Sequence, residues 1–243
     1  MTSDLFGKAF ALLREAYKGV ALTGAGASTE SGIPDFRGKD GLWSRYDPVE
    51  YGTLSAFLAN PEKVWRMLAG LLAAVDAEPN KGHRALATLE QQGLLSGVIT
   101  QNIDSLHQKG GSNNVVEFHG SLDTFSCLLC GAAYDLAFVK ESSLPPHCTS
   151  CNSILKPNIV FFDERIPEAV LKQTDQMLNS ADLLLVAGTS CQILPAAQIP
   201  YMVFKRGGKI IEINREPVLQ QIAAVTLQGN FSTVMEKLVK GLA

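Results

Sequence analysis

The chain has 243 residues, of which 46% are apolar and 19% are charged, so it is long enough to bury a substantial core and argues against extended disorder. Lys and Arg number 21 and Asp and Glu 24, a net charge of −3, so no overall basic field exists to hold nucleic acid. The N-terminus has no basic region followed by an apolar run, and no stretch reaches the roughly 18 apolar residues that cross a bilayer. We therefore expect a cytoplasmic protein that binds neither nucleic acid nor a membrane. We also expect a monomer.

Apolar runs alternate with segments of helical periodicity along the chain. Residues 5–18 have helical spacing, and a short strand follows at 19–23. The same order returns with a helix at 85–95 and a strand at 96–100, and further strands are predicted at 181–187 and 209–213. Such alternation is typical of an α/β fold, a Rossmann-like parallel sheet with helices on both faces, whose ligands bind beyond the carboxyl ends of the strands.

The alternation stops in a segment rich in Cys, Pro and small residues, which indicates a small inserted module at about 121–157. The Rossmann-like part then comprises about 8–33, 80–118 and 160–243. A lid and the helical part of a small domain occupy about 34–75.

The first predicted strand runs into a glycine-rich turn, Gly24-Ala25-Gly26-Ala27-Ser28. Its glycines would let backbone N–H groups approach a pyrophosphate, which favours a dinucleotide site. The third glycine of the usual fingerprint is replaced by Thr29, and no acid clearly ends a second strand. A tight strand-to-helix turn is therefore an equal alternative.

Gly, Pro and Gly interrupt the chain at 32–38, so this segment is predicted to be a loop that serves as a lid. On it, Phe36 would cover an aromatic base and Arg37 would pair with phosphate. The alternative places Phe36 in the core and Arg37 in solvent.

Polar residues Gln101, Asn102 and Asp104 follow the strand at 96–100, where their side chains can face the cleft. Helix capping by Asn102 or Asp104 is the alternative. His119 follows a strand-like run at 115–118 and precedes a glycine, a position suited to projecting into the same cleft, whereas the other three histidines are interpreted as structural.

Four of the five cysteines form two Cys-x-x-Cys pairs, Cys127 with Cys130 and Cys148 with Cys151. This spacing predicts a tetrahedral zinc site, and because four thiolates fill every position the zinc should be structural. His147 is a minor candidate ligand. The fifth cysteine, Cys191, is interpreted as a small buried apolar residue.

These motifs together resemble the sirtuin family in order and spacing, from about Lys8 to about Leu238. The resemblance rests on the turn at 24–28, the lid at 32–38, the segments 100–107 and 117–120, the paired cysteines, and the stretches 156–162, 188–190 and 213–214.

The resemblance implies that 1–243 is the catalytic domain of an NAD-dependent protein-lysine deacylase of prokaryotic type, with NAD as co-substrate and one structural Zn²⁺. It makes His119 the general base, with Asn102 also catalytic, since an imidazole pKa near ~6.5 suits proton removal from a ribose hydroxyl. Asn102 and Asp104 would line the nicotinamide pocket, with Gln101 near the nicotinamide ribose. The implied NAD-binding residues are Gly24, Ala25, Gly26, Ala27, Ser28, Asp35, Phe36, Arg37, Gln101, Asn102, Ile103, Asp104, Gly188, Thr189, Ser190 and Asn214.

The implied substrate is an acyl-lysine protein or peptide that pairs with a short apolar strand at 158–162, bordered by Val160, Phe161 and Phe162. Sirtuins commonly have Gly-Glu next, and Asp163 here leaves the peptide pairing in doubt. The positions that hold a Tyr and an Arg in sirtuins preferring acidic acyl groups are aligned with Leu68 and Leu71. An apolar wall would leave a succinyl carboxylate unpaired, so an acetyl or longer apolar acyl group is expected.

By the same resemblance, the acyl-lysine carbonyl oxygen attacks C1′ of the nicotinamide ribose, which displaces nicotinamide and forms an alkylamidate. His119 then activates the ribose hydroxyls, and attack by the 2′-hydroxyl and later by water yields free lysine and O-acyl-ADP-ribose. Phe36 would shield the reactive carbon from water. Two alternatives are a mono-ADP-ribosyltransferase and a non-catalytic NAD-sensing, zinc-bearing interaction module.

Overall fold

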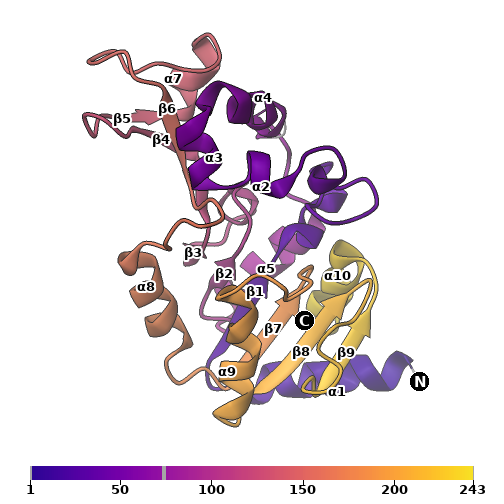
Figure 1. Ribbon diagram of the computed structural model, residues 1–243. Coiled ribbons are helices and arrows are strands. Elements are labelled where there is room, and N and C mark those ends of the chain that lie inside the picture. The colour runs from indigo at the N-terminus through magenta and orange to yellow at the C-terminus, as the bar shows by residue number, and fades with distance from the viewer. Residues whose placement is uncertain (1, 73–74, 243) are drawn as a thin grey trace.

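A six-stranded parallel sheet forms the larger part of the protein in the computed structural model, which describes residues 2–72 and 75–242 (Figure 1). Its strand order is β3-β2-β1-β7-β8-β9. The strands are β1 (Gly19–Thr23), β2 (Val98–Thr100), β3 (Val115–Glu117), β7 (Leu183–Ala187), β8 (Lys209–Asn214) and β9 (Val225–Gln228). All five residues of β1 and of β7 are buried, as expected for central parallel strands covered on both faces.

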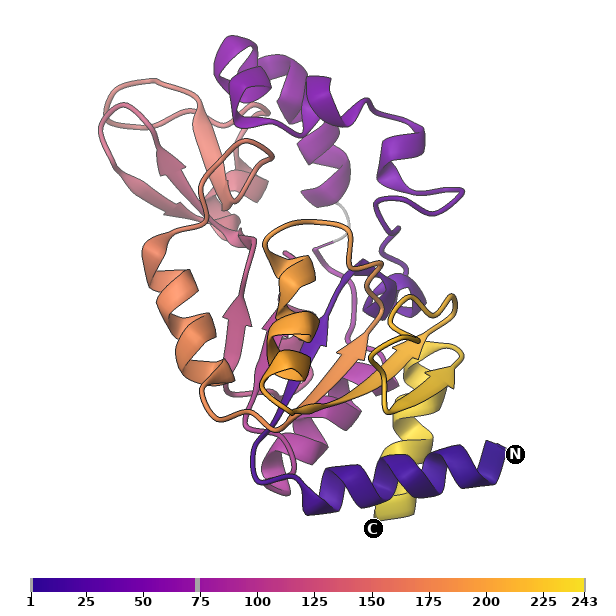
Figure 2. The ribbon, with the colours of Figure 1, turned by 60° about the horizontal axis from the view of Figure 1, so that its bottom comes forward.

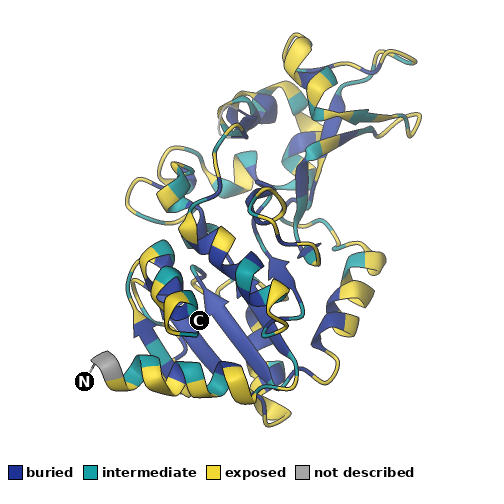
Figure 3. Ribbon diagram, turned by 180° about the vertical axis from the view of Figure 1, so that it is seen from behind, coloured by how far each residue is buried: buried dark blue, intermediate teal, exposed yellow. Residues whose placement is uncertain are grey.

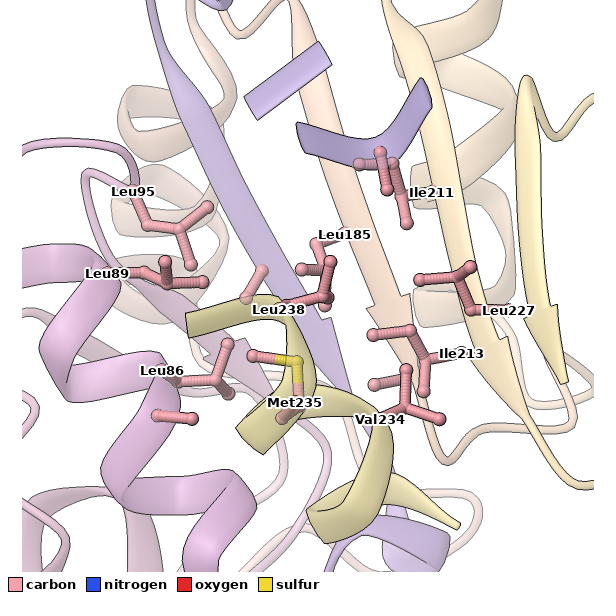
Figure 4. Close-up of a cluster of buried hydrophobic side chains, with 14 of the residues drawn as sticks. Leu86, Leu89, Leu95, Leu185, Ile211, Ile213, Leu227, Val234, Met235 and Leu238 are labelled. Carbon is pink, nitrogen blue, oxygen red and sulfur yellow. The ribbon is translucent and has the colours of Figure 1, made fainter. Parts of the chain in front are cut away.

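Helices cover both faces of this sheet (Figure 2). On one face, α5 (Lys81–Gln91) and α10 (Phe231–Leu242) pack with α1 (Thr2–Glu15) against the strands, and Leu86, Met235 and Leu238 meet Leu185 and Ile213 there (Figure 4). On the other face, α8 (Glu168–Leu178) and α9 (Ile199–Lys205) contribute to a second apolar core. The outer surfaces of these helices carry the exposed residues (Figure 3). The predicted α/β class is confirmed.

A smaller part lies beyond the sheet and combines two segments of the chain (Figure 1). One holds the helices α2 (Pro48–Tyr51), α3 (Leu54–Ala59) and α4 (Pro61–Leu72), and the other holds an antiparallel sheet, β5-β4-β6, with the helix α7 (Leu136–Glu141). Its strands are β4 (Gly120–Cys127), β5 (Ala133–Asp135) and β6 (Leu155–Ile159).

The two segments of the smaller part share one core. The Trp65 indole of α4 donates a hydrogen bond to the Leu155 carbonyl of β6 at 2.9 Å and stacks on Phe125 of β4 with ring centroids 6.0 Å apart. Because this tryptophan is 2% exposed and spans both segments, we expect disturbance of the cysteine-bearing sheet to reach α4.

Three predicted elements differ from the structure by more than shifts of one or two residues at strand ends. The helix predicted at 85–95 is α5, which begins earlier because Asn80 and His83 form a reciprocal capping box. The helix predicted at 5–18 ends at Glu15. The strand predicted at 158–162 is wrong: β6 ends at Ile159, and Phe162 instead pairs in parallel with Thr53, because the chain turns toward the small helices after β6.

The short helix α6 (Leu106–Lys109) follows β2. Two single turns of 3-10 helix, Ala25–Ala27 and Thr29–Ser31, follow β1. None of the helices among the described residues is both long and apolar enough to cross a bilayer.

Candidate functional site

A cleft of about 1330 Å³ lies between the carboxyl edge of the parallel sheet and the smaller part. The loops that follow β1, β2, β7 and β8 line it, so the polar strand ends converge on one site as expected. The strand order reverses between β1 and β7, which is the switch point where doubly wound sheets bind their ligands.

The glycines after β1 serve the contact between two loops at this switch point. A Cβ added to Gly24 would lie 2.8 Å from the Cβ of Thr189, and one added to Gly26 would lie 2.9 Å from the Cα of Gly188. Gly26 N–H also donates to the Gly188 carbonyl at 2.8 Å. Both positions therefore need glycine for the approach of the loop after β7, and both loops line the cleft.

A hydrogen-bonded triad joins the loop after β1 to the loop after β2. The Ser28 hydroxyl donates to Asp104 Oδ2 at 2.6 Å and accepts from Asn102 Nδ2 at 2.9 Å. Asp104 Oδ1 accepts from the Leu106 amide at 3.0 Å, so Asp104 also holds the start of α6. Burial raises the pKa of the Asp104 carboxyl, and the Ser28 hydrogen bond opposes that rise.

This triad borders a small recess that continues from the main cleft. Asn102, Ile103 and Asp104 form one side of the recess, and Phe36 of the lid segment forms another. Ser28 and Asp104 reach the recess and not the main cleft, and Ala27 lines neither. The recess therefore combines amide and carboxylate groups with apolar walls.

Two buried histidines, which the sequence pattern favoured only as structural residues, pack next to the triad. The rings of His83 and His107 meet edge to face with centroids 4.8 Å apart, and His83 Nε2 lies 3.5 Å from Ser28 Oγ. Burial lowers the pKa of His83 to about 4 and that of His107 well below its usual value. The Asn80-x-x-His83 spacing, which is typical of a capping box, is the sequence signal that could have identified the role of His83.

His119 lines the cleft with one ring nitrogen engaged. Its Nδ1 lies 3.1 Å from the Gln101 carbonyl, and since a carbonyl only accepts, Nδ1 carries the proton and Nε2 is left as an acceptor. Burial lowers the pKa of His119, and the bond to Gln101 opposes this. A neutral imidazole with a free Nε2 at neutral pH has the form that a general base requires.

The lid segment borders the cleft over its full length between residues 32 and 43. Asp35 Oδ1 accepts from the Gly38 amide at 2.6 Å and so holds a turn, and Asp35 itself lines the cleft. Phe36 packs on Trp43 with ring centroids 5.6 Å apart and also lines the cleft, while Arg37 is exposed at its rim. Trp43 was not among the residues predicted from the sequence. Its ring also packs near that of Phe162, with ring centroids 5.9 Å apart.

Side-chain hydrogen bonds join the loop after β7 to the loop after β2 and to the end of β8. Gln101 Nε2 donates to Thr189 Oγ1 at 3.0 Å, and Asn214 Nδ2 donates to the Thr189 carbonyl at 3.1 Å. Gly188, Ser190 and Asn214 line the same cleft. Predicted residues from all four strand ends thus line the cleft or its recess, with Ala27 as the exception.

The apolar wall contributed by α4 differs from the prediction. Leu71 lines the cleft, but Leu68 is fully buried in the core of the smaller part and does not, so its assignment to the substrate wall is wrong. Met67 lines the cleft instead, because residues four apart lie on the same face of a helix. The wall is still apolar.

Asp163 is committed to contacts within the chain. Its Oδ1 accepts from the Leu54 amide at 2.8 Å and its Oδ2 accepts from the Ser55 hydroxyl at 2.6 Å, which fastens the segment 160–163 to the start of α3. Its backbone has φ of 61°, a region that glycine and Asp or Asn tolerate best. Val160, Phe161 and Phe162 line the cleft beside it.

The four cysteines meet at one point of the smaller part. Their sulfur atoms lie within 4.8 Å of one another, and Cys127 to Cys151 and Cys130 to Cys148 are separated by 3.4 and 3.5 Å. Four thiolates around zinc at about 2.3 Å would lie about 3.8 Å apart, so the set fits a tetrahedral ion. His147 does not belong to this cluster among the described residues.

Comparison with known proteins gives a consistent result. The family model described as "Sir2 family" matches residues 24–195, more than half of the chain. NAD-dependent protein deacylase 1 of Archaeoglobus fulgidus is 47% identical over 91% of both chains, and the NAD-dependent protein deacylase of Thermococcus kodakarensis is 42% identical over 97% of this chain and 95% of its own.

Solved structures agree with these relatives. A Sir2 homologue in complex with NAD has a TM-score of 0.91 at 44% identity, covering 97% of this chain and 93% of its own. A Sir2 protein bound to a deacetylated peptide and 3′-O-acetyl ADP-ribose has a TM-score of 0.91 at 35% identity, covering 97% and 98%.

Proposed function

The chain belongs to the Sir2 family, and from this premise we propose that it is an NAD-dependent protein-lysine deacylase that moves the acyl group from lysine to ADP-ribose and releases nicotinamide. The observation that carries the proposal is the meeting of His119, Gln101 and Asn102 with the glycine-rich loop in one cleft at the switch point of the sheet. NAD is the co-substrate that this cleft receives.

The loops at the strand ends would hold the dinucleotide, with the recess beside Ser28, Asn102 and Asp104 receiving the nicotinamide. A carboxamide offers a donor to the Asp104 carboxylate and an acceptor to an amide group, which is the complement of this polar wall. Phe36 closes the apolar side of the recess and excludes water from it.

His119 acts as the general base toward a ribose hydroxyl. The Gln101 carbonyl fixes the proton on Nδ1, so Nε2 takes the proton that the hydroxyl loses. Because the pKa of His119 is lowered by burial, the ring is neutral and ready to accept at pH 7.

The acylated peptide would lie along residues 160–163, in a strand-addition mode, with its acyl-lysine passing toward the apolar wall of Met67 and Leu71. This wall offers no cation to a carboxylate, so acetyl and longer apolar groups are favoured over succinyl. Asp163 already accepts two hydrogen bonds at α3, which favours a role in holding this segment.

The zinc site is structural. Four thiolates leave no position for water, and the cluster lies in the smaller part that carries β4 and β6. The cytoplasmic location, the monomeric state, the absence of nucleic-acid and membrane partners, and the division at 8–33, 34–75, 80–118, 121–157 and 160–243 stay predictions.

The test is incubation of the protein with NAD and an acetyl-lysine peptide, with nicotinamide, O-acetyl-ADP-ribose and peptide mass followed together. We expect nicotinamide release that depends on the peptide, with O-acetyl-ADP-ribose and deacetylated peptide formed by the wild type and not by His119→Ala. ADP-ribose attached to protein, with the peptide still acetylated, would replace the proposal with a transferase. Nicotinamide binding or NAD binding without turnover would replace it with a sensing module. Faster release of succinyl than acetyl from matched peptides would overturn the acyl preference.

A further inference from the structure

A buried lysine lies beneath the segment that forms the proposed peptide surface. Lys156, on β6, is 5% exposed, and its ammonium donates to the Ile159 carbonyl at 2.8 Å and to the Pro157 carbonyl at 3.2 Å. Burying an ammonium group is unfavourable unless it is paired and hydrogen-bonded. The side chain is therefore committed to shaping the chain at the end of β6.

The same ammonium pairs with Glu164, at the other end of the segment. Lys156 Nζ lies 3.1 Å from Glu164 Oε1, while Glu164 Oε2 accepts from the Phe161 amide at 2.9 Å. The ammonium also lies 5.1 Å from the centroid of the Phe161 ring. Lys156 and Glu164 thus lie at the two ends of the segment 157–163 and hold the Phe161 backbone between them.

The segment 157–163 is connected to the catalytic side of the cleft. The Val160 amide donates to the His119 carbonyl at 2.8 Å, and Gly120 is paired with Ile159 across β4 and β6. Residues 159–164 all line the cleft, whereas Lys156 does not. Any influence of Lys156 on the reaction therefore passes through this segment.

We propose that Lys156 and Glu164 form a positioning pair that fixes residues 157–163, which include the peptide-binding segment 160–163, in the shape that receives the acylated peptide. The inference rests on the proposed function and adds to it the residues that set peptide affinity. Its consequence is selective: loss of the pair weakens peptide binding, while the NAD-binding loops after β1, β7 and β8, which do not contact the pair, keep their affinity for NAD.

The test compares Lys156→Met, Glu164→Gln and the double variant with the wild type, with peptide binding measured by fluorescence anisotropy of a labelled acetyl-lysine peptide and KM measured separately for peptide and NAD. Lys156→Met should weaken peptide binding on the order of 10- to 100-fold, since small misplacements of a substrate have effects of this size. The KM for NAD should stay within about twofold of the wild type. The double variant should lose less than the sum of the two single losses, because Glu164→Gln removes the partly buried charge that Lys156→Met leaves unpaired.

Leu238→Ala is the matched control, because Leu238 is fully buried in the core below the sheet and lies outside the cleft. It should lower Tm without changing peptide affinity, which separates positioning from general destabilisation. If Lys156→Met does not fold, Glu164→Gln alone decides by its weaker peptide binding at unchanged KM for NAD.

Two results would overturn the inference: peptide affinity that is unchanged in a folded variant, or KM values for peptide and NAD that rise together. An inactive wild type that still binds the peptide more tightly than Lys156→Met would refute the proposed deacylation and leave the positioning pair standing.

Discussion

Lowering the pH from 7 to 5 is expected to destabilise the protein, and His83 supplies a calculable part of the effect. This ring is fully buried, and burial lowers its pKa from an ordinary 6.5 to about 4. Since the pKa is lower in the folded than in the unfolded chain, the unfolded chain binds the proton first. The stabilising contribution of neutral His83 is therefore present above pH 6.5 and lost as the pH falls from 6.5 to 4.

The fall of the pKa from 6.5 to about 4 corresponds to roughly 3 kcal/mol in full, of which about 2 kcal/mol is lost between pH 7 and pH 5. Urea unfolding of the wild type and of His83→Asn at pH 7, 6 and 5 measures this. The asparagine keeps an acceptor for the Asn80 amide, which now donates to His83 Nδ1 at 3.2 Å. The variant is less stable at pH 7 because of the lost ring, but its stability should change less with pH.

The difference between the two pH slopes isolates His83 and its neighbour His107 from other acid-sensitive groups. Burial also lowers the pKa of His107 and His119, and acid protonates cysteine thiolates, so all of these weaken the wild type in the same direction. The contributions of His119 and the cysteines remain in His83→Asn and cancel in the comparison, whereas His107, whose ring contacts His83, does not cancel, so the difference in slope reports this pair of rings. A variant whose stability falls as steeply as that of the wild type would refute the assignment of the acid effect to His83.

Four further outcomes are expected. Ser28→Ala should lower the free energy of unfolding by about 1–3 kcal/mol and raise KM for NAD, because Asn102 loses its partner; an unchanged KM would show that the triad does not shape the nicotinamide recess. Asp163→Ala should lower Tm and weaken peptide binding, because the hydrogen bonds to Leu54 and Ser55 are lost. Asp163→Asn, which keeps an acceptor oxygen, should have a smaller effect on both. Equal Tm values and equal peptide affinities by anisotropy for both variants and the wild type would contradict this. Removing metal with a chelator should abolish deacylation and lower Tm, with recovery on adding zinc, and full activity of verified metal-free protein would exclude a structural ion. The rate at low peptide concentration should fall on the acid side with a midpoint below 6.5, since only neutral His119 accepts a proton, and a midpoint above 7 would point to another group.

The sequence was sufficient to predict five of the six strands of the sheet and the edge where its polar residues meet, whereas β9 was not predicted. Strands such as 183–187 are continuous apolar runs followed by small or polar residues, and that pattern follows directly from burial on both faces of a parallel sheet. The convergence of Gln101 and Asn102 with the glycine-rich turn followed from the same geometry, because parallel strands bring their carboxyl ends to one edge.

Contacts between distant segments were not predictable from local pattern. The strand at 158–162 was misplaced because an apolar run does not reveal where β6 leaves its partner, which depends on the pairing of Phe162 with Thr53. Leu68 was placed at the cleft by alignment with a position of other sirtuins, and that alignment does not show which face of α4 meets the core and which carries Met67 and Leu71.

The structure gives a different physical reason for glycine at the two positions after β1 than the sequence suggested. The sequence suggested that Gly24 and Gly26 admit a pyrophosphate, whereas the structure shows that a Cβ at either would strike the loop of Gly188 and Thr189. The requirement for glycine therefore arises from the packing of two strand-end loops, and those loops are the ones that border the cleft.

A crystal structure of the protein with an unreactive NAD analogue and an acetyl-lysine peptide bound would test the proposed site most directly. The account predicts one dinucleotide across the loops after β1, β2, β7 and β8, with His119 Nε2 in contact with a ribose hydroxyl, directly or through one water. An imidazole turned away from the ribose, or a dinucleotide bound elsewhere on the protein, would contradict it.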